Sequence, residues 1–166
     1  LEDISQPNCY KVLDVLREET EIPVWHDDAQ GTACVTLAGL INAVKLADKK
    51  MEDVKLVFLG AGASNATIAR IVITAGAKPE NVIVFDSKGA LHSGREDVKN
   101  DPRFYRKWEL CRTTNLGKVD GFDEAMKGAD ALIALSKPGP DVVHPDSVKL
   151  MGKKPIVFAC ANPVPE

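Results

Sequence analysis

An apolar segment that ends directly in two glycines is the feature of this sequence that most limits its fold. Residues 54–59 are almost entirely apolar, and Gly60 and Gly62 follow with one alanine between them. Apolar residues then recur at helical spacing in the next segment: Ile68, Ala69, Ile71, Val72 and Ile73. This pattern predicts a buried β-strand, a tight turn, and an α-helix whose N-terminus faces the turn.

A turn of this kind suits the pyrophosphate of a dinucleotide. Glycine allows the sharp turn and the close approach of the backbone, and the helix start offers unpaired N–H groups at the positive end of its dipole. We therefore expect the cofactor-binding residues to include Gly60, Gly62, Ala63 and Ser64. The alternative is a plain tight turn. Asn65 stands where a third small residue is usual, and we expect it to loosen the packing of helix on strand.

A second predicted strand, residues 82–85, ends at Asp86. Its carboxylate is placed to accept hydrogen bonds from a ribose hydroxyl and to repel a 2′-phosphate, which favours NAD over NADP. Ser87 and Lys88 follow at once and argue for NADP, because they could bind that phosphate. We expect NAD as the cofactor, with NADP as the alternative.

The composition is typical of one globular domain. The chain has 166 residues, 45% of them hydrophobic, which suits one domain with a real core. A net charge of −3 gives no reason to expect nucleic acid or a membrane surface as partner. The four cysteines form no close pair, as is typical of reduced thiols in the cytoplasm.

Predicted strands alternate with predicted helices along the chain. This order indicates an α/β fold of Rossmann type, a mainly parallel sheet with helices on both faces. Ligands bind such sheets outside the carboxyl ends of the strands, where Ser136 and Asn162 follow the last two predicted strands. We expect further strands at 129–135 and 155–160, helices at 5–20, 31–47, 101–110, 122–127 and 145–151, and a loop at 87–99.

Two acidic pairs flank the first predicted helix: Glu2 with Asp3, and Asp27 with Asp28. Such carboxylates often do no more than cap a helix. The alternative is a hard divalent cation, Mg²⁺ or Mn²⁺, which prefers oxygen ligands. His26, beside the second pair, is expected to be a hydrogen-bonded structural residue rather than a base.

Taken together, these segments resemble the malic enzyme family, and most closely its shorter, prokaryotic-type members. The resemblance covers essentially the whole chain. It is carried by Glu2-Asp3, by the stretch from His26 to Ala33, by Gly60-Ala61-Gly62, and by the closing Ala161-Asn162-Pro163-Val164-Pro165-Glu166.

The resemblance implies oxidative decarboxylation of malate to pyruvate and CO₂ with reduction of NAD or NADP. It implies a Mg²⁺ or Mn²⁺ ion held by Glu2, Asp3 and Asp28, with Asp27 assisting proton transfer and Asn162 contacting the substrate. It also implies a homodimer and catalytic Lys and Tyr residues in a preceding domain. We therefore expect this chain to be part of a longer protein, a dinucleotide-binding domain over residues 1–166 whose helical segment 5–47 carries the metal-site residues. Alone, it should bind dinucleotide but not turn over malate.

Two other functions stay open at this point. One is a catalytically silent dinucleotide-binding module that serves regulation, which would have no need of the acidic pairs. The other is an amino-acid dehydrogenase-type domain, which would work without a metal. Dependence of the activity on a divalent cation therefore separates the malic enzyme function from both alternatives.

Overall fold

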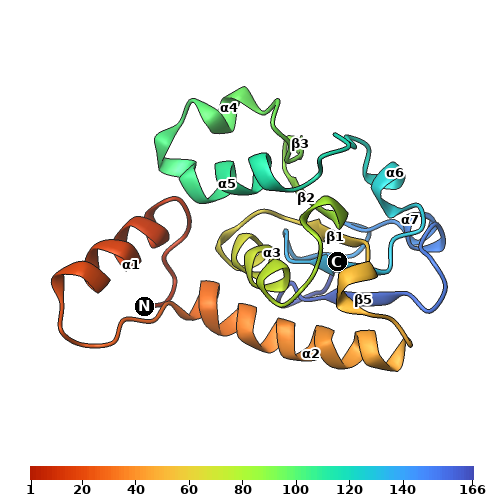
Figure 1. Ribbon diagram of the computed structural model, residues 1–166, viewed down its shortest axis with the longest axis horizontal. Helices are drawn as coiled ribbons and strands as arrows, with labels where there is room; N and C mark the ends of the chain where they lie inside the picture. The colour runs from red at the N-terminus through yellow and green to blue at the C-terminus, as the bar shows by residue number, and fades with distance from the viewer.

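A single five-stranded sheet forms the centre of the structure, a computed structural model that describes residues 1–166 (Figure 1). The order of its strands is β3-β2-β1-β4-β5, so the glycine-turn strand β1 lies in the middle. All neighbours are parallel except β2 and β3, which form an antiparallel pair. The strands are β1 (Leu56–Leu59), β2 (Val82–Asp86), β3 (Gly89–Ala90), β4 (Ala131–Ala134) and β5 (Ile156–Ala159).

Strands β1, β2 and β4 are buried on both faces, whereas the edge strand β5 is partly exposed, and alternate residues face opposite sides. Leu56 and Phe58 of β1 belong to a core of 22 buried residues under the long helices, whereas Val57 belongs to a smaller core of eight under the short ones. The long helices are α2 (Thr32–Leu46), α3 (Ala63–Thr74) and α5 (Tyr105–Thr113). The short ones are α6 (Phe122–Met126) and α7 (Pro145–Lys149). The predicted Rossmann-type α/β fold is confirmed.

One predicted segment differs from the structure. The expected loop 87–99 contains strand β3 and the one-turn helix α4 (Glu96–Lys99), which leads through a 3₁₀ turn, η4 (Pro102–Phe104), into α5. Two residues of strand give no alternating pattern that a sequence could reveal. The hairpin matters for the site, because it returns the chain to the end of β2 and brings Arg95 back to Asp86.

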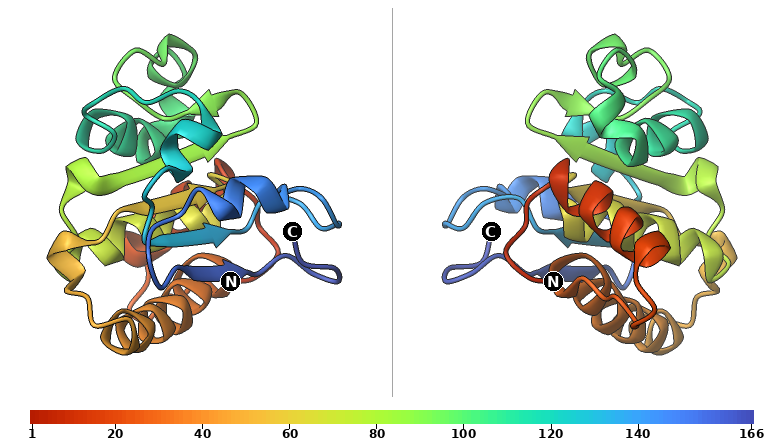
Figure 2. Two further views of the ribbon diagram at one scale, coloured as in Figure 1. Left: turned by 90° about the vertical axis from the view of Figure 1, so that its right-hand side faces the viewer. Right: turned by 90° about the vertical axis from the view of Figure 1, so that its left-hand side faces the viewer.

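The N-terminal segment packs against the first turn of α3. Helix α1 (Asn8–Glu19) forms the left-hand end of the molecule in Figure 1 and faces the viewer in the right-hand panel of Figure 2. The Tyr10 hydroxyl donates to the Ala63 carbonyl oxygen at 2.8 Å. Burial raises the pKa of this phenol to about 12, so the hydroxyl stays a donor at any physiological pH. The helix is thereby fixed to the element that follows the glycine turn.

Three short turns complete the chain. A π turn, η1 (Asp27–Gly31), precedes α2, and short 3₁₀ turns η2 (Met51–Asp53) and η3 (Pro79–Asn81) precede β1 and β2. None of the helices is both long enough and apolar enough to cross a bilayer.

Candidate cofactor and metal site

A cleft of about 560 Å³ opens at the carboxyl ends of β1, β2 and β4. This is the edge at which parallel α/β sheets bind their ligands. The residues that line it are Gln6, Leu59, Gly60, Ala61, Gly62, Asp86, Ser87, Lys107, Leu135, Ser136, Lys137 and Val142. The structure thus brings together four of the predicted cofactor residues, Gly60, Gly62, Asp86 and Ser136.

The two glycines have different physical roles. Gly60 has a φ of +98°, and a Cβ atom there would lie 2.4 Å from the Leu135 carbonyl oxygen. It must therefore be glycine for the chain to pass beneath the loop that follows β4. Gly62 has an ordinary φ of −72°, and a Cβ atom there would meet nothing within 4 Å. That open space borders the cleft. The missing side chain of Gly62 therefore leaves room for a ligand, whereas that of Gly60 avoids a clash with the backbone.

Asn65 holds the glycine turn together, and the expectation that it loosens the packing is wrong. Its side chain is fully buried in the first turn of α3. The Nδ2 group donates to the carbonyl oxygens of Leu59 at 2.9 Å and Gly60 at 3.0 Å. These carbonyls lie at the end of β1, and the Leu59 carbonyl oxygen also accepts from the Leu135 N–H at 2.9 Å, so the amide adds a second donor there. A side-chain amide replaces the small residue and binds helix to strand.

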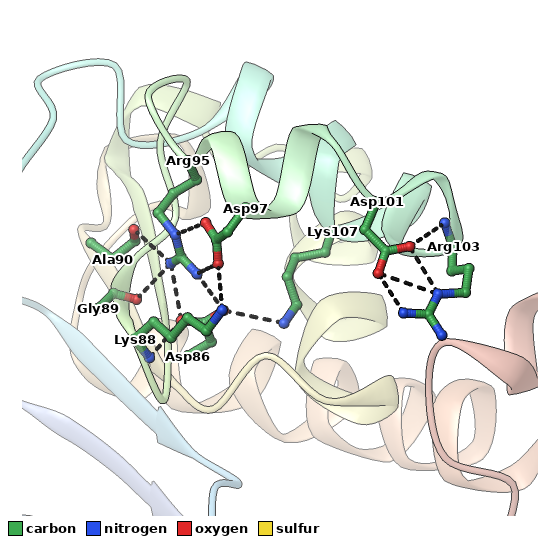
Figure 3. A network of polar contacts seen from close by, with 9 residues as sticks. All are labelled: Asp86, Lys88, Gly89, Ala90, Arg95, Asp97, Asp101, Arg103 and Lys107. Carbon is green, nitrogen blue, oxygen red and sulfur yellow. Dashed lines mark hydrogen bonds and ion pairs between the residues drawn. The ribbon is translucent and has the colours of Figure 1, made fainter.

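Asp86, at the end of β2, is surrounded by cations (Figure 3). Arg95 donates to both of its carboxylate oxygens, at 3.0 and 2.9 Å, and the Lys107 ammonium lies 3.2 Å from Oδ2. Burial alone raises the pKa of Asp86, but the bonds from Arg95, the Lys88 N–H and Lys107 outweigh it and hold the pKa below its usual value. The carboxylate is ionised and paired.

This pairing predicts how stability changes in acid. A folded-state pKa below the unfolded value means that Asp86 stabilises the fold above about pH 4 and loses that contribution as the pH falls through the folded pKa. Asp86→Asn should therefore be less stable than wild type at pH 7, with a difference that shrinks below about pH 4. Urea unfolding across that range measures the difference, with the exposed Glu52→Gln as control. A pH-independent difference would remove the ionic explanation.

The loop after β4 is fixed by residues 164–166. The Glu166 carboxylate accepts from the Ser136 N–H at 2.8 Å and from the Ala161 N–H at 3.1 Å. The Gly139 N–H donates to the Val164 carbonyl oxygen at 3.0 Å. Ser136 therefore lines the cleft in a loop held from behind. Asn162, the predicted substrate contact, lies on the same segment with an exposed side chain.

The two acidic pairs lie side by side, although they are far apart in the sequence. The Asp27 N–H donates to the Leu1 carbonyl oxygen at 2.8 Å. The Asp3 N–H then donates to the Asp28 carboxylate at 2.7 Å. These oxygen donors suit a hard cation in kind. No three His, Cys, Asp or Glu side chains come close enough to hold an ion by themselves.

The acidic segment is also joined to the glycine turn. The Ser64 hydroxyl, in the first turn of α3, donates to the Asp28 carbonyl oxygen at 2.7 Å. The predicted role of Ser64 as a cofactor contact is thus accompanied by a structural one. The Gln6 side chain lines the cleft and donates to the Ala61 carbonyl oxygen. The acidic segment and the residues before α1 are therefore held next to the glycine turn.

His26 takes the structural role that we expected. It is fully buried, its Nδ1 accepts from the Ala29 N–H at 3.4 Å, and its Nε2 lies 3.2 Å from the Ile4 carbonyl oxygen. Both ring nitrogens are therefore used in contacts within the protein. Asp27, which follows, packs its carboxylate over Gly31, where a Cβ atom would lie 2.2 Å from Oδ1. His26 holds the π turn that presents Asp27 and Asp28.

Sequence reasoning missed four residues of this site: Gln6, Arg95, Lys107 and Glu166. Each reaches the site from a segment remote from the strand end that it contacts. Glu166 closes a segment that carries the family resemblance, but no local pattern gives any of the four a contact in the site, so only the tertiary fold reveals it.

A glycine turn at the centre of a mainly parallel sheet, with a carboxylate at the end of the next strand, defines a dinucleotide-binding domain of Rossmann type. The family of the chain follows from comparison with known proteins. Residues 29–166 match the family described as malic enzyme, NAD binding domain, and the chain belongs to this family.

Individual relatives align with the entire length of this chain. The chain is 43% identical to an NAD-dependent malic enzyme of Geobacillus stearothermophilus and 40% identical to an NADP-dependent malic enzyme of Halomonas elongata, of which it covers 33% and 37%. The crystal structure of Entamoeba histolytica malic enzyme matches all of it with a TM-score of 0.98 and 64% identity, over 34% of that chain. The chain spans about a third of the length of these relatives.

Proposed function

We propose that this chain supplies the cofactor and metal part of the active site of an enzyme that oxidatively decarboxylates malate to pyruvate and CO₂. NAD or NADP would accept the hydride, and the complete enzyme would act as a homodimer in the cytoplasm. Membership of the malic enzyme family supports the reaction. The observation that carries the proposal is the bond from Ser64 to the Asp28 carbonyl oxygen, because it joins the acidic segment to the helix that follows the glycine turn.

The proposed chemistry needs that proximity. The hydride must pass from C2 of malate to the nicotinamide ring, so the substrate has to lie between the cofactor and the groups that hold its oxygens. Glu2, Asp3 and Asp28 would hold Mg²⁺ or Mn²⁺ after their side chains turn toward the ion, with substrate oxygens and water completing the shell. Such an ion supplies polarisation of the C2 oxygen and stabilisation of the enolate left when CO₂ departs.

The remaining residues bind the substrate and move protons. Asn162 follows β5 at the ligand-binding edge of the sheet, where its amide would bind a malate carboxylate. Asp27 would assist the proton transfers: the C2 hydroxyl loses a proton as the hydride leaves, and C3 of the enol gains one after CO₂ departs. The exposed position of Asp27, adjacent to Asp28, suits this role.

Asp28→Asn in the full-length enzyme tests the proposal. The variant should need at least about tenfold more Mn²⁺ for half-maximal turnover of malate, because one charged ligand is lost, and its turnover should fall. Reduced-cofactor absorbance during a Mn²⁺ titration measures both. Asp53→Asn, an exposed carboxylate in η2, is the matched control and should behave as wild type.

The alternatives give different outcomes in the same assay. A silent dinucleotide-binding module would bind NAD or NADP and show no turnover with malate at any Mn²⁺ concentration. An amino-acid dehydrogenase-type enzyme would be active without a metal. If Asp28→Asn turns over malate with an unchanged Mn²⁺ requirement, Asp28 is not a metal ligand.

A further inference from the structure

The hydrogen-bonding capacity of Asp86 is fully used within the protein. An ionised carboxylate offers about four acceptor positions. The Lys88 N–H and one Arg95 nitrogen bind Oδ1, at 2.9 and 3.0 Å. The other Arg95 nitrogen and the Lys107 ammonium bind Oδ2, at 2.9 and 3.2 Å. A ribose hydroxyl could bind Asp86 only by displacing one of these donors. The NAD preference expected from the sequence assumed a free carboxylate, and the structure removes that premise.

Lys107, in contrast, keeps hydrogen-bond donors that no group of the protein accepts. Its ammonium carries three N–H groups, and its one hydrogen bond goes to Asp86. The side chain is 12% exposed, lies 5.0 Å from the centre of the Phe104 ring, and lines the cleft beside Asp86 and Ser87. A cation held in place by a carboxylate and an aromatic ring, with free donors at a cleft, is prepared to bind an anion.

The charge around this point is positive. Three cations, Lys88, Arg95 and Lys107, face two carboxylates, Asp86 and Asp97 (Figure 3). The network therefore carries a net charge of +1, and Lys137 adds another positive charge to the cleft lining. A 2′-phosphate next to Asp86 would meet a neutralised carboxylate and a surplus of cations, rather than the repulsion that an unpaired Asp86 would cause.

We propose that the adenosine end of this cleft is built for a 2′-phosphate, so that the enzyme prefers NADP⁺ over NAD⁺, with Lys107 as the residue that binds the phosphate. Asp86 is then a positioning residue that holds Lys107 and Arg95, rather than the acceptor for the ribose. Ser87 and Lys88 are the next groups in reach of the same phosphate. This inference rests on the proposed function, since it assigns the substituent on the dinucleotide that the cleft binds.

Calorimetric titration of the full-length enzyme with NADP⁺ and NAD⁺ tests the inference. NADP⁺ should bind at least about tenfold more tightly, because a hydrogen bond between charged groups is lost with NAD⁺. Lys107→Gln should weaken the binding of NADP⁺ at least about tenfold and change the dissociation constant of NAD⁺ by no more than about twofold. Lys107→Arg keeps the charge and should retain most of the preference. Lys99→Gln, an exposed lysine of α4 paired with Glu96, is the matched control.

A second measurement needs no variant. Wild-type enzyme should bind adenosine 2′,5′-bisphosphate more tightly than adenosine 5′-monophosphate, and this result would support the inference even if Lys107→Gln failed to fold. Tighter binding of NAD⁺, or an equal loss of both cofactors in a folded Lys107→Gln variant, would overturn the inference and leave the proposed function intact. If neither dinucleotide binds wild type, the proposed function falls and the inference falls with it.

Discussion

Gly60→Ala should lower the free energy of unfolding by about 3 kcal/mol or more, through backbone strain and steric overlap together. A positive φ of +98° is unfavourable for any residue with a Cβ atom. The new Cβ would lie 2.4 Å from the Leu135 carbonyl oxygen and 2.9 Å from the Ser136 Cα, both backbone atoms that no side-chain rotation can move. The loop after β4 must shift, so dinucleotide binding should be lost as well.

Gly62→Ala is the matched control in the same turn. Its Cβ would meet nothing within 4 Å, and its φ of −72° suits any residue. This variant should keep the melting temperature of wild type and lose affinity for the dinucleotide, because the added methyl enters the space left for the ligand. Thermal unfolding and cofactor titration of both variants separate the two roles. Equal stability of the two variants would contradict the assignment.

Asn65→Asp has the second large expected effect, a loss of about 3 kcal/mol or more at neutral pH. The change replaces an amide donor by a carboxylate at a fully buried position. Asn65 Nδ2 faces the carbonyl oxygens of Leu59, Gly60 and, at 3.4 Å, Ile133. A negative charge there would oppose three carbonyl dipoles with no hydrogen to share.

Denaturant unfolding measures this cost. Asn42→Asp makes the same chemical change on the exposed surface of α2, where the amide donates to the Ala38 carbonyl oxygen, and should cost well under 1 kcal/mol. The Asn65→Asp protein should regain stability as the pH falls, because protonation restores a donor and removes the charge. A variant as stable as wild type at neutral pH would show that these carbonyls do not depend on Asn65.

Much of this fold could be predicted from the sequence, because its central elements carry strong local patterns. The strand before Gly60 is apolar throughout, which is typical of a strand buried on both faces, and the glycine turn has few alternative structures. Helix α2 was expected at 31–47 and lies at Thr32–Leu46. Strand β3 could not be predicted, because two residues give no period and its position depends on pairing with β2.

The site was harder to predict than the fold, for a different reason. A sequence shows which residues end a strand, but not which remote side chains meet them there. Asp86 was identified correctly as a cleft residue, yet its partners Arg95 and Lys107 come from the hairpin connection and from α5. The same holds for Asn65. Its contribution to stability depends on three carbonyl oxygens that only the folded sheet brings together.

The Glu166 carboxylate has a consequence for how ligands would affect one another. It binds the Ser136 N–H of the cleft loop and the Ala161 N–H next to Asn162, so one side chain joins the loops after β4 and β5. A shift of one loop would therefore be passed to the other through this side chain. Under the proposed function, thermodynamic reciprocity then requires that any effect of the dinucleotide on the affinity for malate equals the effect of malate on the affinity for the dinucleotide.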